Sequence, residues 1–239
     1  MPTAGKFAVA ILAVLLLASC ASVSVDDLHY ADVPTQAPEK IFVEPFDVDK
    51  GVVRVDRQGR ELPKFKEELA ARMAQEIVQR LSKSVAPAEI IATGETPPKG
   101  NNWLVRGKIL RVHQGSRALR WLVGLGAGGT KMETSVALTD CSGKKPKSLL
   151  SFETTGGSNL TQGVGGVVAF PVSGPMALTS AAGVFDGAVT GVSFDTKRTA
   201  RQITAVINDY LHRHGQLKDK PRMKPKLLGG VPLPIGEKE

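Results

Sequence analysis

The sequence predicts an α/β (α+β) domain, in which a mixed sheet of about five strands has amphipathic helices packed on it, plus a Gly-rich, charge-poor segment. Short apolar runs of strand length and two longer segments with helical spacing are the observations behind this prediction. Their order along the chain suits helices packed against a single sheet. The strand-like runs cover 41–48, 88–93, 103–112, 131–140 and 148–155, and the helical segments cover 62–81 and 203–211.

The first two elements are a strand and a long helix. The run 41–48 is apolar and contains Pro45, which is tolerated only at the margins of a sheet. The helix is predicted because apolar residues recur every three or four positions, with Pro63 suited to the first turn. The apolar positions are Leu62, Phe65, Leu69, Met73, Ile77 and Leu81.

Three alternating runs follow and predict an antiparallel ribbon. Within 131–140, the apolar Met132 and Val136 alternate with Glu133 and Ser135. Successive side chains of a strand point to opposite faces, so one face of this ribbon is expected to be buried and the other wet.

The final element is a second amphipathic helix. Asp195 or Thr196 is a candidate N-cap, and Gly215 is the expected stop. The apolar positions of this helix are Ile203, Val206, Ile207, Tyr210 and Leu211.

The N-terminus has the features of an export signal. Lys6 precedes an apolar run over 7–17, and Leu17-Ala18-Ser19-Cys20 supplies small residues before a cysteine. This segment resembles the lipobox of bacterial lipoproteins, which implies cleavage between Ser19 and Cys20 and lipidation of Cys20. The alternatives are an ordinary signal peptide with an incidental cysteine, or an uncleaved anchor.

These elements give a domain organisation with four parts. A Lys- and Pro-rich tail is expected to be disordered, and serves either for solubility or for attraction to anionic headgroups. The parts are a lipoprotein signal peptide at 1–19, a lipidated tether at 20–38, an α/β domain at 39–215 with a Gly-rich insertion at 156–194, and the basic tail at 216–239.

Two resemblances support the location and the fold. The first strand, the helix and Trp103 to Ile109 resemble small periplasmic α/β lipoprotein domains, a class that includes accessory factors for secretion and for peptidoglycan synthesis. The stretch 117–128, with an Arg-then-Gly-x-Gly-x-Gly pattern, and the strand ending at Asp140 before Gly143 are similar to the DUF4410 family of bacterial lipoproteins. The resemblance spans about residues 40–215, and that family has no assigned activity.

Two groups of residues are candidates for contacts. Arg117 and Arg120 flank an apolar turn and suit a ligand or partner contact, because a guanidinium presents a planar fork of donors; they equally suit protection of a strand edge. Gly183, Gly187 and Gly191 repeat every fourth residue, which on a helix gives a packing stripe for lipid or a second copy, or a segment packed on the protein's own sheet.

Several functional classes are disfavoured. The glycines at 124, 126 and 129 match a dinucleotide fingerprint but precede a strand-like run and lack the acidic partner. No Gly-x-Ser-x-Gly is present, and His212 and His214 point apart on a helix, so no cofactor, metal or catalytic residue is expected. The formal charge of +8 drops by one when Lys6 leaves with the signal, and export removes nucleic acid as a partner.

The expected function is therefore that of a lipid-anchored, periplasm-facing envelope lipoprotein, acting as a binding or scaffolding module and not as an enzyme. Ala21 follows Cys20, where aspartate would favour inner-membrane retention, so the outer membrane is the expected location. The partners are the membrane through lipid on Cys20 and an envelope protein or cell-wall component. The alternatives are a self-associating or membrane-inserting subunit that uses 156–194 and, as a third class, an envelope hydrolase.

Overall fold

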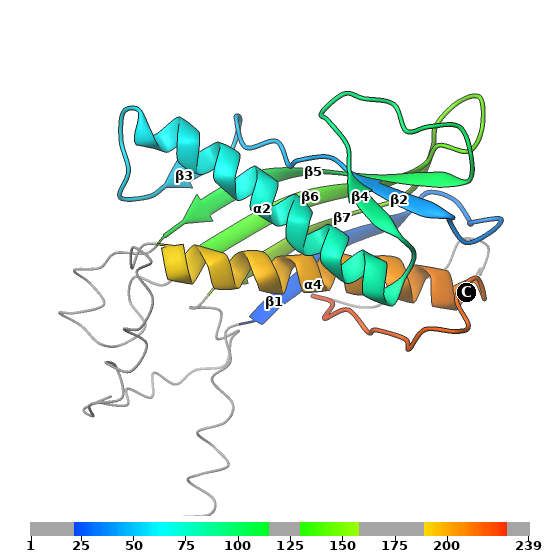
Figure 1. Cartoon of the computed structure of the whole chain (residues 1–239). Helices are drawn as coiled ribbons and strands as arrows, with labels where there is room; N and C mark the ends of the chain where they lie inside the picture. The colour runs from blue at the N-terminus through cyan, green and yellow to red at the C-terminus, as the bar shows by residue number, and fades with distance from the viewer. Residues whose placement is uncertain (1–21, 115–129, 158–188, 229–239) are drawn as a thin grey trace, which may run out of the picture.

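The computed structural model describes residues 22–114, 130–157 and 189–228, which form one sheet with two helices (Figure 1). The class predicted from the sequence is confirmed, although the sheet has seven strands where about five were expected. The elements are β1 Ser22–Tyr30, β2 Lys40–Val43, β3 Val52–Arg54, α2 Glu61–Ser84, β4 Ala88–Ile90, β5 Asn102–His113, β6 Lys131–Asp140, β7 Lys147–Gly157 and α4 Val189–Arg213.

The sheet is mixed, with strand order β1-β7-β6-β5-β2-β4, and β3 pairs with the far end of β5. The pairs β5–β6, β6–β7 and β7–β1 are antiparallel, which confirms the predicted ribbon. The strands β2, β3 and β4 pair in parallel. Parallel β2 and β4 are joined through α2, because parallel neighbours need a crossover connection.

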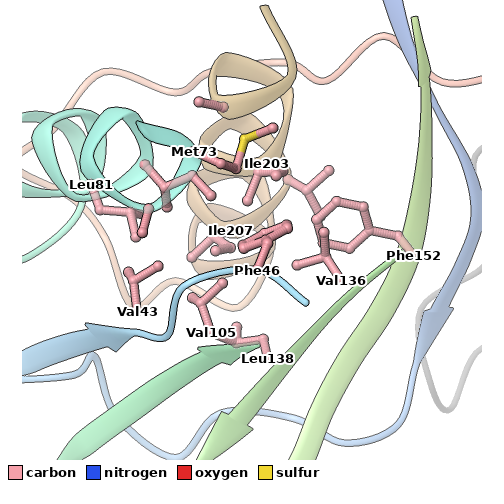
Figure 2. Close-up of a cluster of buried hydrophobic side chains, with 14 of the residues drawn as sticks. Val43, Phe46, Met73, Leu81, Val105, Val136, Leu138, Phe152, Ile203 and Ile207 are labelled. Carbon is pink, nitrogen blue, oxygen red and sulfur yellow. The ribbon is translucent and has the colours of Figure 1, made fainter. Parts of the chain in front are cut away.

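Both helices lie on the same face of the sheet, and their apolar stripes meet it in one core (Figures 1 and 2). Met73 and Ile77 of α2 and Ile207 of α4 are completely buried, each contributing about 1.5–3 kcal/mol of hydrophobic stabilisation. At Gly107 of β5, the ring of Phe46 occupies the space that a Cβ would need. This close packing requires glycine at that position.

The expected tether at 20–38 is wrong over most of its length, because β1 begins at Ser22. Val23 and Val25 alternate with polar residues, and β1 pairs antiparallel with β7, from Ser22 opposite Gly157 to Tyr30 opposite Leu150. The strand is stabilised by a partner well over a hundred residues away, so its order does not arise locally.

The expected disordered tail is also wrong for 216–228, which packs on α4 and β1. The N–H of Val25 donates to the Lys226 carbonyl at 2.7 Å, and the N–H of Leu228 donates to the Val25 carbonyl at 2.7 Å. Asn208 of α4 donates to the Pro221 carbonyl at 3.2 Å and accepts the Met223 N–H at 2.7 Å. Residues of the helix therefore hold a segment whose own composition predicts disorder.

The last helix starts earlier than expected. Asp195 and Thr196 lie inside α4 rather than at its N-cap, while Gly215, with φ +68°, follows the helix end as predicted. Because β7 runs through Gly157 and α4 begins at Val189, the insertion expected at 156–194 narrows to 158–188.

Candidate functional site

The face of the sheet opposite the helices is built from alternate residues of β5, β6, β7 and β1. The strand registers place four polar side chains in one row across it: Lys108 is opposite Ser135, Ser135 is opposite Glu153, and Glu153 is opposite Asp26. Each of these positions neighbours core residues in sequence, so the alternation that buries Val136 and Phe152 turns this row outward. Among the described residues both helices lie on the other face.

A bulge in β5 adds a second cation to this face. The pairing with β6 shifts between Ile109 and Arg111, so that one extra residue, Leu110, is inserted. Arg111 consequently lies opposite Glu133, with Nε 3.3 Å from Oε2. Without the bulge, strict alternation would place Arg111 on the same face as Ile109, toward the core.

The row contains an electrostatic conflict. Glu153 and Asp26 are directly opposed carboxylates on neighbouring strands, an arrangement that is destabilising without a cation. Within the parts of the chain that the structure describes, neither Lys108 nor Glu153 has an ion-pair partner within 4.0 Å. In contrast, Arg106 on the same strand pairs with the buried Glu44 at 2.8 Å.

The middle of this face is smooth. On β6 and β7, Ser135, Ala137 and Ser151 are small and partly exposed, and Glu133 of β6 beside them is paired with Arg111 and Lys131. Such a surface suits contact with another flat, charged surface. We call it the open face, defined by Asp26, Arg106, Lys108, Arg111, Ser135, Ala137, Ser151 and Glu153.

At one end of the sheet, the last residues of β3, β5 and β7 lie beside the first residues of β6 and β1. His113 is opposite Lys131, Lys131 is opposite Gly157, and Gly157 is opposite Ser22. Arg54 of β3 is opposite His113 and completes the row. We call this row the anchor end, because Ser22 follows Cys20 by two residues in the sequence.

A shallow hollow between α2 and α4 is closed by its own side chains. The Arg57 guanidinium lies over the Phe65 ring at 4.7 Å, and Arg72 donates to the Ser193 hydroxyl at 3.3 Å. These contacts place both guanidinium groups against the protein's own side chains, so the hollow is a weaker candidate than the open face.

Two buried ionisable groups have raised pKa values. Asp195 is 1% exposed, and burial raises the pKa of its carboxyl although Thr130 and Arg198 oppose the shift. Tyr210 donates to the Asp32 carbonyl at 2.6 Å and stacks on Tyr30, with ring centroids 5.7 Å apart. Burial raises the pKa of Tyr210 well above its ordinary value, so the phenol stays protonated as a donor.

Most residues singled out in the sequence lie outside the described residues, and only Gly191 is placed, in the first turn of α4. Cys141 is half-buried, and burial raises the pKa of its thiol. In 22–114, 130–157 and 189–228, no group of three or more His, Cys, Asp or Glu side chains is placed to hold a metal ion. The residues outside are Ser19, Cys20, Arg117, Arg120, Gly183 and Gly187.

Sequence reasoning did not identify the open face. The sequence did contain an indication of it, because polar residues alternate with apolar ones in 103–112 and 131–140. That Glu153 lies opposite Asp26 could not be predicted, because residues 20–38 were expected to form a tether and not a strand of the sheet. No helix among the described residues is long and apolar enough to cross a membrane.

Comparisons with known proteins identify a family and several distant structures, among them the two described below. The model of a family described as "Domain of unknown function (DUF4410)" matches residues 21–155. No curated protein sequence matches the chain.

The two structures share only a low level of similarity with this chain. A variant of the PelC dodecamer from Paraburkholderia phytofirmans is 12% identical, with 72% of this chain and 94% of that chain covered and a TM-score of 0.32. The hypothetical protein CT253 from Chlamydia trachomatis is 12% identical, with 75% and 98% covered and a TM-score of 0.36. At these TM-scores the likeness carries no inference about this chain.

Proposed function

The chain belongs to the DUF4410 family, a domain of unknown function, and from its own geometry we propose that it is a lipid-anchored, periplasm-facing envelope lipoprotein. In this proposal it acts as a non-catalytic binding or scaffolding module at the outer membrane. Its partner is an envelope protein or a cell-wall component.

The observation that carries the proposal is the start of β1 at Ser22. Only Ala21 would separate a lipidated Cys20 from the first residue of the sheet, so the Cα atoms of Cys20 and Ser22 would be at most about 7 Å apart. Two or three acyl chains bind a bilayer durably, because each buried methylene contributes about 0.8 kcal/mol. The domain would therefore be held directly at the membrane surface, with its anchor end toward the lipid.

This short connection also defines which surface is presented. The strands run away from the anchor end, so the open face would stand upright on the membrane and face sideways. A scaffold that presents charge laterally suits partners in the same envelope layer.

The anchor is tested by labelling cells with radioactive palmitate and comparing Cys20→Ala with Cys141→Ala. These are the two cysteines of the chain, so Cys141→Ala is a matched control. Cys20→Ala should abolish the label and release the protein from the membrane fraction, whereas Cys141→Ala should retain both. Label that persists in Cys20→Ala contradicts the proposal.

The same samples test the finer location. Density-gradient separation of the two membranes should place the wild-type protein with the outer membrane, because Ala21 follows the modified cysteine. Recovery with the inner membrane would contradict that part of the proposal alone.

A second candidate function is a self-associating or membrane-inserting subunit that uses the Gly-rich segment. The observation in its favour is that Gly157 and Ser22 are directly opposed, so the segment departs from the sheet beside the anchor. Its test is included with the interface experiment below.

A further inference from the structure

The charge pattern of the open face leads us to infer that this face binds a second copy of the same chain, with a two-fold axis parallel to the strands. The orientation of the pair in the membrane rests on the proposed lipid anchor, while the pairing itself rests on the described residues alone.

The open face is electrostatically asymmetric across its strands. Its cations on β5 are Arg106, paired with Glu44, Arg111, paired with Glu133, and Lys108, which has no ion-pair partner within 4.0 Å among the described residues. Its acids without an ion pair lie two and three strands away, at Glu153 of β7 and Asp26 of β1. Adjacent strands are about 4.8 Å apart, so the separation from Lys108 to the two acids is about 10–14 Å.

A rotation about an axis that is parallel to the strands and lies near β6 exchanges these two sides. It brings β5 of one copy over β7 and β1 of the other, and it preserves the position along the strands. Lys108 of each copy then meets the opposed Glu153 and Asp26 of its partner. The ammonium supplies the cation that these two carboxylates lack within one chain.

The alternative axis, perpendicular to the strands, is disfavoured by the charges without ion pairs. With this axis in the row of Lys108, β5 would lie over β5, so that Lys108 would meet Lys108 and Glu153 would meet Glu153. Like-charge juxtaposition across an interface is strongly unfavourable, so the pattern selects one symmetric arrangement. In C2 symmetry the same patch serves both copies, as this pattern requires.

The centre of the face permits close approach. Ser135 lies beside the inferred axis, and Ala137 and Ser151 are its small neighbours. Long side chains at these positions would keep the two sheets apart and prevent the ion pairs from forming.

Membrane anchoring and this symmetry are compatible. An axis parallel to the strands keeps both anchor ends at the same level, so both Cys20 lipids enter one leaflet. Four strands over about six residues cover about 20 Å by 20 Å, or about 400 Å², which is smaller than the roughly 800 Å² per partner of a stable interface. Confinement to a membrane raises the effective concentration, so the pair is expected on membranes and is weak in dilute solution.

The interface is tested by crosslinking in native membranes. The reporter is Ser135→Cys in a Cys141→Ser background, treated with a short bifunctional maleimide. Lys108→Glu and Glu153→Lys should each lower the yield of crosslinked dimer by about tenfold, because each sets like charges together. The double variant should restore the yield, since the exchanged charges again meet across the axis.

The control variants are matched in charge and exposure. Lys64→Glu, on the exposed side of α2, should leave the yield unchanged, and a Gln75→Cys reporter on α2 should give little dimer. An unchanged yield in Lys108→Glu overturns the interface, as does a double variant that is no better than the single ones. A yield that is insensitive to Lys108→Glu and lost in Gly187→Leu supports the second candidate function instead.

Failure of the anchor and failure of the interface give different results. Palmitate label is measured on the same samples. Absence of label together with charge-dependent crosslinking refutes the anchor and leaves the interface. Normal label with crosslinking that ignores the charge variants refutes the interface alone.

Discussion

At the residue scale, the burial of Asp195 makes the stability of the folded protein depend on pH. Its carboxyl lies in α4 with Arg198 Nη1 3.6 Å from Oδ1, and burial raises its pKa above the ordinary value of 3.8 despite this cation. A carboxyl with a raised folded-state pKa favours the folded state when protonated. Its contribution to stability is therefore greatest below pH 3.8 and is lost as the pH rises through the raised pKa.

We accordingly expect Asp195→Asn to stabilise the protein more at pH 7.5 than at pH 4, because asparagine cannot ionise. The free energy of unfolding is measured in urea at both values. Asp49→Asn, at an exposed position, is the control and should show no such difference. An equal effect of Asp195→Asn at the two pH values would contradict the prediction.

The sequence identified Asp195 as a residue of interest for the wrong reason. Aspartate is frequent at N-caps, and the apolar spacing of the last helix becomes clear only from Ile203. The helix begins at Val189, and Asp195 becomes internal. Local propensity could not show this, because the packing of Val192 against the core helps to fix the first turns.

At the element scale, the segment 216–228 depends on a short part of α4. Asp209 accepts from Arg213 Nε and from Arg222 Nε, both at 2.6 Å, and its side chain is only 4% exposed. Asn208 also donates to the Ser84 carbonyl at 2.8 Å, which ties α2 to the same point. Two adjacent residues thus connect both helices and the C-terminal segment.

Asp209→Asn should therefore lower the free energy of unfolding by about 1–3 kcal/mol. A larger loss is not expected, because both arginines retain access to water. The substitution should also expose 218–224 to limited trypsin digestion. Asp219→Asn, exposed in the same segment, is the matched control. Identical digestion of the two variants would show that the segment is held by other contacts.

Elements with strong local periodicity were predictable. The run 131–140 is the strand β6 residue for residue, and the apolar stripe from Leu62 to Leu81 lies within α2. The strand β1 was not predictable, because its alternation of apolar and polar residues is short and two prolines follow it. Its order comes from β7 and from the chain near Leu227, neither of which is visible in its own sequence.

At the scale of the whole molecule, the proposed lipid anchor would fix the orientation of the domain on the membrane. The strand β6 has ten residues and spans about 30 Å between Lys131 at the anchor end and Asp140 at the other. A domain held by Cys20 should keep these two ends at different heights above the bilayer.

This orientation is measured with a fluorophore at Arg54→Cys or Ser142→Cys, in a Cys141→Ser background, in vesicles that contain headgroup-quencher lipids. Arg54 lies in the anchor-end row, and Ser142 follows β6 at the far end. Quenching should be strong at the first site and weak at the second. Equal quenching would show a domain lying flat on the membrane, with the open face unable to meet a second copy.

The pairing of β1 with β7 and Leu227 also determines when the protein can fold. Contacts between residues so far apart form slowly, because a long loop must close before they are made. If the proposed export is correct, a chain that crosses the membrane N-terminus first could not complete these contacts of β1 until the residues near Leu227 had emerged. The contacts of β1 with β7 and with the chain near Leu227 would then be among the last to form.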